Sequence, residues 1–183
     1  MEEIEARAER VLGSVPSYIW DGERLPVPIE DVVESHYGLL VRDVEDMTAA
    51  PDCPELEPGQ SLSGLLLATR GEIWVSADEA RQWPRRRRFT IGHELGHWVM
   101  HRAGRPSVFC RSATVQPDEQ EAAGADAPPP PDIEEEASAF AAALMMPARL
   151  LQREYERDRT FERLCARFGA SGAAMGRRLH AVI

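Results

Sequence analysis

Apolar side chains recur along the chain with two different spacings, which predict helices in some segments and strands in others. Spacings of three and four residues are typical of amphipathic helices, whereas short apolar runs between turn residues are typical of strands. The helical spacing covers the first dozen residues and the segments 28–38, 84–102 and 132–147. Short apolar runs predict strands at 39–44, 62–69, 72–76 and 107–111. Arg70 and Gly71 separate two of these strands, so we expect a hairpin there.

This order of elements predicts an α+β fold, a mostly helical single domain with a small three- or four-stranded sheet. After Pro147 the pattern predicts two or three more short helices, of which the last two have a helix-turn-helix shape around Gly169. We expect residues 1–147 to form the principal domain and residues 148–183 to form a helical extension packed on it. Residues 112–131 lack apolar periodicity and end in consecutive prolines, which predicts a mobile loop.

Composition and charge narrow the classes of protein that fit. The chain has 183 residues, 43% of them hydrophobic and 28% charged, as is typical of one folded domain. Its formal net charge of −10 disfavours direct binding to nucleic acid, which requires a basic surface. The acidic start of the chain and the lack of an apolar run of roughly 20 residues predict neither a signal peptide nor a membrane span. Three widely spaced cysteines fit a reducing compartment, so we expect a cytoplasmic protein.

The most specific chemical signal is the segment His93-Glu94-Leu95-Gly96-His97, which lies inside a predicted helix. Side chains four residues apart on a helix differ in direction by about 40°, so both imidazoles can bind one zinc ion. Glu94 points about 100° away from His93, where its carboxylate can accept a proton from the attacking water without becoming a ligand. The spacing therefore predicts His93 and His97 as zinc ligands and Glu94 as the catalytic acid and base.

A catalytic zinc of this kind needs a third protein ligand and one coordination position left for water. Six residues after the second histidine, where some metallopeptidases have a third histidine, this chain has Ala103. His101 is separated from His93 by roughly 12 Å along the helix axis, so it lies too far away to share the metal with both histidines. We expect His101 to pack or cap near the helix end, and the third ligand to come from another helix.

The helix predicted after the loop begins with three candidate carboxylates, Glu134, Glu135 and Glu136. The apolar residues of this helix define the direction of the core, and Glu135 points away from it. Glu134 and Glu136 flank the core face at similar angles, so helix geometry alone does not choose between them. Ser138, one turn after Glu134, can support a ligand histidine by a hydrogen bond, whereas Phe140 follows Glu136. This favours Glu134 as the third ligand, with Glu136 as the alternative.

A run of four arginines, Arg85 to Arg88, precedes the histidine motif on the same predicted helix. Positive charge near a helix N-terminus is unfavourable because the helix dipole is positive there. We therefore expect acidic groups, either of this chain or of a partner, to neutralise the run.

The chain reads RFTIGHELGHWVMH over residues 88–101 and IEEEASAFAAALMMP over residues 133–147. These segments closely resemble the ImmA/IrrE family of zinc metallopeptidases, which typically reads R-F-T-x-A-H-E-L-G-H and then E-x-E-A-N-x-F-A-x-x-L-L-M-P. The similarity is strong at the two motifs and weak before residue 62. Two positions differ, because Gly92 stands where Ala is common and Ser138 stands where Asn or Asp is common.

The resemblance implies that His93, His97 and Glu134 bind zinc, that Glu94 is the catalytic acid and base, and that residues 1–147 form a metallopeptidase domain. It also implies cleavage of a specific protein substrate, often a helix-turn-helix transcriptional repressor. The competing hypothesis is a non-catalytic regulatory or antitoxin-like module with a structural zinc and a tail that binds DNA or protein. Because the net charge is negative, we expect the tail to close the core instead of binding nucleic acid.

Overall fold

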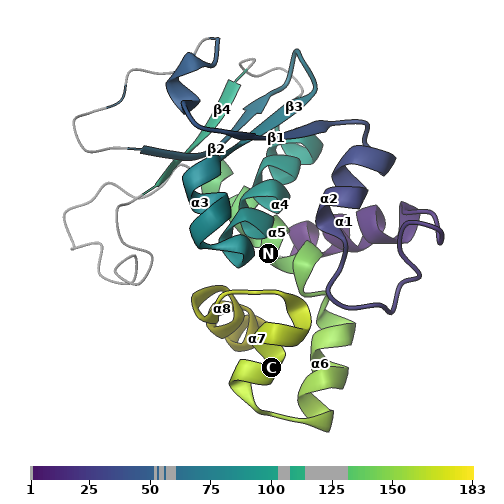
Figure 1. Ribbon diagram of the computed structural model, residues 1–183. Coiled ribbons are helices and arrows are strands. Elements are labelled where there is room, and N and C mark those ends of the chain that lie inside the picture. The colour runs from purple at the N-terminus through teal and green to yellow at the C-terminus, as the bar shows by residue number, and fades with distance from the viewer. Residues whose placement is uncertain (1, 52, 54–55, 57–60, 103–107, 114–131) are drawn as a thin grey trace.

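The computed structural model describes residues 2–51, 53, 56, 61–102, 108–113 and 132–183, with side chains for all of these except 108–113 and 132. It has an α+β architecture, which confirms the predicted fold class (Figure 1). A small sheet covers one end of the molecule, and helices α4 (Pro84–Met100) and α5 (Asp132–Met145) lie beneath it. The opposite end consists of α6 (Ala148–Arg157), α7 (Phe161–Phe168) and α8 (Gly172–Val182).

The sheet contains β1 (Leu40–Val44), β2 (Ser61–Leu67), β3 (Glu72–Ser76) and β4 (Val108–Ala113) in the order β1-β3-β2-β4. Strand β3 pairs with β1 in parallel, and β2 pairs with both β3 and β4 antiparallel. The predicted hairpin is confirmed as β2 and β3. Its turn contains Gly71, whose φ of 66° favours glycine. The predicted strand bounds agree to within two residues, and residue 107 lies outside the described residues.

The N-terminal half differs from the predicted pattern in two details. Helix α1 (Glu2–Ser14) forms as predicted, but α2 (Ile29–Asp31) is only one turn long and continues as a π-helical turn, η1 (Val32–His36). The wider turn arises where the Tyr37 N–H donates to the Val32 carbonyl at 3.2 Å. A 3-10 turn, η2 (Met47–Ala49), lies between β1 and β2 in the chain. Helix α3 (Ala77–Gln82) follows β3 and is not indicated by apolar spacing. Its local signal is the N-cap Ser76, which accepts a hydrogen bond from the Glu79 N–H.

The C-terminal segment forms three helices, and its last helix is tied to the first one. Arg178 of α8 donates to the Met146 carbonyl at 2.9 Å and pairs with Glu5 of α1. The predicted loop at 112–131 begins later than expected, since residues 112 and 113 belong to β4; its remainder lies outside the described residues. None of the described helices has the length and apolar character that crossing a membrane requires.

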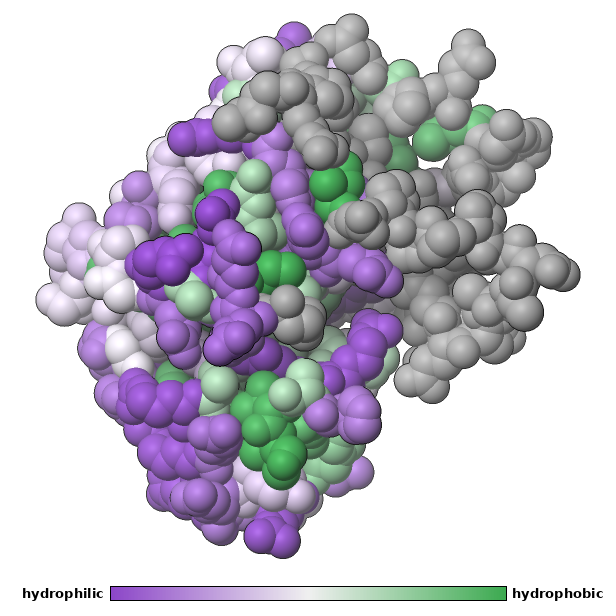
Figure 2. All heavy atoms as spheres, turned by 180° about the vertical axis from the view of Figure 1, so that it is seen from behind, coloured by the Kyte–Doolittle hydropathy of each residue, from purple (hydrophilic) through white to green (hydrophobic). Residues whose placement is uncertain are grey.

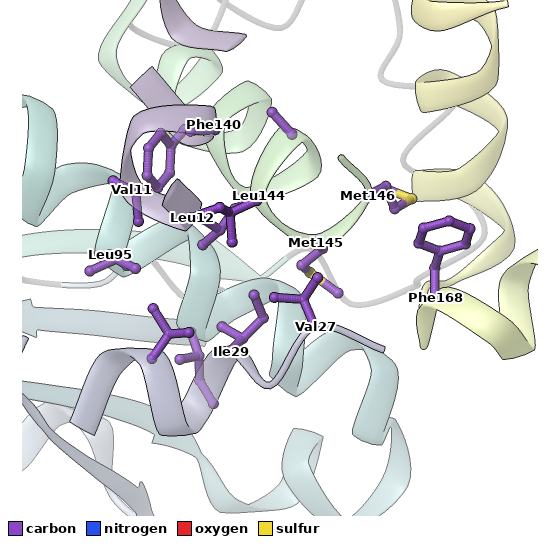
Figure 3. Close-up of a cluster of buried hydrophobic side chains, with 14 of the residues drawn as sticks. Val11, Leu12, Val27, Ile29, Leu95, Phe140, Leu144, Met145, Met146 and Phe168 are labelled. Carbon is purple, nitrogen blue, oxygen red and sulfur yellow. The ribbon is translucent and has the colours of Figure 1, made fainter. Parts of the chain in front are cut away.

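The apolar residues of helices far apart in the sequence meet in one principal core. Figure 3 shows side chains from α1, α2, α4, α5 and α7 and from the segment before α2 converging there. The labelled members are Val11, Leu12, Val27, Ile29, Leu95, Phe140, Leu144, Met145, Met146 and Phe168. The described surface in Figure 2 is mainly hydrophilic, with a hydrophobic area toward the end formed by the C-terminal helices. Since α7 contributes to the same core as α1, the C-terminal helices are packed on the rest of the fold.

Helices α4 and α5 run antiparallel and approach closely along two glycines of α4. A Cβ atom on Gly96 would lie 3.1 Å from the Ala137 Cα and 3.2 Å from its carbonyl oxygen. A Cβ atom on Gly92 would lie 3.4 Å from the Ala141 Cβ, an ordinary van der Waals contact. The backbone of α5 therefore occupies the space that a side chain at Gly96 would need, but not the space at Gly92.

Substitution by alanine should change the stability of the fold in opposite directions at the two glycines. In a helix interior, alanine is more favourable than glycine by about 1 kcal/mol. We expect Gly92→Ala to gain most of this stabilisation, whereas Gly96→Ala adds overpacking strain of about 1–3 kcal/mol and lowers stability by up to about 2 kcal/mol. Urea unfolding of both variants measures the difference, and equal stabilisation by both would show that α5 moves away without cost.

Candidate metal centre

Helix α4 presents His93 and His97 on one side, one turn apart. Pro84 begins the helix at a position where its missing N–H is not required, and the helix ends at the cap residue His101. Both imidazoles are buried, and their Nε2 atoms lie 3.1 Å apart. The local helix spacing thus aims two ring nitrogens at one common position.

Helix α5 adds one carboxylate to this pair. The Oε2 atom of Glu134 lies 3.1 Å from His93 Nε2, and its Oε1 atom lies 3.1 Å from His97 Nε2. Ligand atoms from these three residues all lie within 4.8 Å of one another. Two imidazole nitrogens and a carboxylate oxygen are ligands that zinc accepts, and three protein ligands leave a fourth position for water. The residues therefore fit the metal that the motif predicts.

The environment of Glu134 favours its ionised form. Burial opposes ionisation, but hydrogen bonds from His93 and His97 outweigh it and lower the pKa of Glu134 to about 2. A carboxylate that remains charged near neutral pH is the form that binds a divalent cation.

The structure distinguishes the three neighbouring glutamates of α5. Glu134 faces the two Nε2 atoms, whereas the Oε2 atom of Glu136 lies 2.8 Å from His101 Nε2. Glu135 is exposed. The rotation of α5 relative to α4 thus turns Glu134, and not Glu136, toward the histidine pair.

Ser138 lies close enough to His93 to support this histidine by a hydrogen bond, as predicted. Its Oγ atom is 3.1 Å from His93 Nδ1, the ring nitrogen on the side opposite Nε2. A hydrogen bond at Nδ1 fixes the ring orientation and leaves Nε2 directed at the ligand position. The short side chain of serine is therefore long enough to reach the outer ring nitrogen of His93.

Glu94 is fully buried and lies against strand β2, outside the group formed by the three ligand residues. A Cβ atom on Gly64 would come within 2.6 Å of Glu94 Oε1 and 2.4 Å of Thr90 Cγ2. Only a glycine leaves this space for the glutamate without a shift of the surrounding atoms. The interpretation of the sequence missed Gly64, although a glycine inside an apolar strand is a signal of close approach.

Two members of the arginine run, Arg86 and Arg87, have acidic partners within the chain, as one of the two predicted alternatives requires. Arg86 and Arg87 form ion pairs, and Arg88 donates to a carbonyl. The contacts are Arg86 Nε to Glu79 Oε2 at 3.1 Å, Arg87 Nη1 to Glu30 Oε2 at 2.6 Å, Arg87 Nε to Asp43 Oδ1 at 2.8 Å, and Arg88 Nη2 to Val27 O at 2.8 Å. These contacts attach the start of α4 to α3, β1 and the segment around α2, and so fix the helix that carries both histidines.

Comparison with known proteins relates the chain to a protein family and to solved structures. A family model described as IrrE N-terminal-like domain, Peptidase M78, matches residues 64–180. A transcriptional regulator from Mycobacterium tuberculosis aligns with 98% of this chain at a TM-score of 0.53 and 16% sequence identity. The chain spans 47% of that protein, and at this identity the likeness shows the fold alone. No curated protein sequence matches the chain.

The ligand geometry predicts that Glu134→Gln weakens zinc binding strongly. Gln replaces the anionic donor by a neutral amide of the same shape. We expect a loss of zinc affinity larger than the roughly 10- to 100-fold typical of a lost outer-shell partner. Competition with a chromogenic chelator measures this affinity, and Glu135→Gln, which removes an exposed neighbouring charge, is the matched control. Equal affinities for both variants would exclude Glu134 as a ligand.

Proposed function

Since the chain belongs to the IrrE N-terminal-like family, Peptidase M78, we propose that it is a zinc-dependent endopeptidase that hydrolyses a peptide bond in a specific protein partner. Family membership confirms the resemblance seen in the two sequence motifs. The observation that carries the proposal is the convergence of His93, His97 and Glu134 from two helices, next to the buried Glu94. Such a donor set is typical of catalytic zinc sites.

The chemistry divides between the metal ligands and Glu94. His93, His97 and Glu134 would hold zinc, which when bound supplies Lewis-acid activation of the water and the scissile carbonyl. The carboxylate of Glu94 accepts one proton from the water as the water oxygen bonds to the carbonyl carbon. Glu94 then gives that proton to the departing amine as the C–N bond breaks, which restores its starting charge.

The position of β4 supports a polypeptide substrate. Strand β4 is at the edge of the sheet, and in the described part of the chain it pairs only with β2, the strand that contacts Glu94 through Gly64. An extended peptide can add to such an edge by main-chain hydrogen bonds. We propose a DNA-binding repressor as the substrate, as the family resemblance implies, and the cytoplasm as the compartment, as the cysteine content predicts.

The contacts of the C-terminal helices favour the enzyme over a DNA-binding module. Arg178, one of two adjacent arginines on α8, is buried and paired with Glu5, so its charge is neutralised inside the fold. Arg177 remains exposed. The exposed arginines of α7, Arg163 and Arg167, pair with Asp158 and Glu154. On a chain of net charge −10, these helices provide little attraction for a phosphate backbone.

The first prediction from this proposal concerns the Glu94→Gln variant. Gln keeps the size of the side chain but cannot accept the proton, so cleavage should fall by at least about 100-fold while zinc binding and the unfolding midpoint stay unchanged. The zinc-loaded chain is incubated with a panel of helix-turn-helix repressors, and the products are identified by mass spectrometry.

The matched control for this experiment is Glu135→Gln, which should cleave at the unmodified rate. Full cleavage, or a full biological effect, by Glu94→Gln would overturn the enzymatic proposal. A salt-dependent shift of DNA by the uncleaving protein would instead favour the binding module.

The second prediction is that Gly64→Ala lowers cleavage without removing zinc. The added methyl group displaces Glu94 or Thr90, and a displacement of about 1 Å can reduce the rate by about 100-fold. Zinc affinity should change little, because the three ligands belong to α4 and α5. Gly176→Ala, which adds a methyl group in open space, is the control. Unchanged cleavage by Gly64→Ala would show that Glu94 does not need this space.

A further inference from the structure

A third histidine lies on the same side of α4 as the two candidate ligands. His101 is one turn beyond His97 and is buried, at the end of the helix. Its Nδ1 atom is 3.1 Å from His97 Nδ1, and its Nε2 atom is 2.8 Å from Glu136 Oε2. His101 therefore connects the outer nitrogen of a candidate ligand to a carboxylate on α5.

The proton positions along this connection follow from the chemistry of neutral imidazole, which has one N–H and one lone pair. To bind a metal, His97 must offer the lone pair of Nε2, and its Nδ1 then carries the proton. That N–H donates to His101 Nδ1, which must accept. The N–H of His101 is then at Nε2, where it donates to the carboxylate of Glu136.

We propose that His101 and Glu136 form an outer relay that holds His97 in the tautomer and orientation needed for coordination through Nε2. The two residues are positioning residues that act through His97 and do not contact the metal themselves. A carboxylate hydrogen-bonded to a ligand histidine commonly fixes its ring and raises its basicity, and here a second imidazole extends that connection. This inference rests on the proposed zinc site.

The relay also explains why the two neighbouring glutamates of α5 differ in their contacts. Glu134 faces the Nε2 atoms, whereas Glu136 faces His101 and remains half exposed. The two ligand histidines thus have different outer partners, the hydroxyl of Ser138 for His93 and the imidazole of His101 for His97. We expect removal of the Glu136 charge to weaken the hydrogen bond between His101 and His97. The contact between Ser138 and His93 should stay unchanged.

The test measures zinc affinity of the full chain by competition with a chromogenic chelator, without any substrate. His101→Phe keeps an aromatic ring but removes both hydrogen bonds, and it should weaken zinc binding by about 10- to 100-fold. Glu136→Gln should weaken it by a smaller factor, because the amide oxygen still accepts from His101. Glu135→Gln should bind zinc as the unmodified chain does.

The double variant distinguishes a relay from two independent effects. If Glu136 acts through His101, adding Glu136→Gln to His101→Phe causes no further loss of affinity. Ring nitrogen NMR of the zinc-loaded chain gives a second readout that packing alone does not change. The Nδ1 proton of His97 should be detected in the unmodified chain and should exchange rapidly with water in His101→Phe.

The possible results distinguish failure of the relay from failure of the zinc site. Unchanged zinc affinity in folded His101→Phe and Glu136→Gln, or an equal effect of Glu136→Gln with and without His101, would overturn the relay and leave the zinc site standing. If His101→Phe does not fold, the single Glu136→Gln variant decides, since its side chain is half exposed. Failure of the unmodified chain to bind zinc would overturn the metal site itself, and the relay with it.

Discussion

The close contact between α4 and α5 is the constraint on which the candidate site depends. Zinc ligands on one helix can be aligned by helix spacing alone, but the third donor belongs to another helix. Glu134 reaches the Nε2 atoms of His93 and His97 because Gly96 lets the backbone of α5 approach without an intervening side chain. Burying two imidazoles and a carboxylate is unfavourable unless they satisfy one another or a cation, and their mutual contacts at 3.1 Å meet this requirement.

The opposite end of α4 is fixed by charge instead of by close packing. Arginines at the start of the helix would oppose its dipole, but carboxylates from α3, β1 and α2 face them. Helix α4 is thus attached to three other elements at its first turns and to α5 at its histidines. The same contacts place the charges of Arg86 and Arg87 inside the fold, opposite carboxylates of the same chain.

Much of the fold follows from local sequence signals. The hairpin, α1, α4, α5 and the short C-terminal helices all lie where apolar spacing and turn residues predict them. Helix α3 was missed because six residues are too few for a clear helical period, and its start is marked only by the capping Ser76. The π-helical turn at Val32–His36 was missed because it differs from an α-helical turn by one residue, a difference that apolar spacing does not resolve.

The shared direction of His93 and His97 follows from local spacing, because residues four apart on one helix share a face wherever that helix is placed. The sequence also indicates Glu94 as a candidate base and leaves Glu134 and Glu136 as the two candidates for a third ligand. The packing of the elements turns Glu134 instead of Glu136 toward the two histidines, and it places Gly64 against Glu94. Packing also connects His101 with His97 and Glu136. These contacts depend on the rotation and separation of packed elements, which the side chains of the whole core set together and which no local spacing specifies.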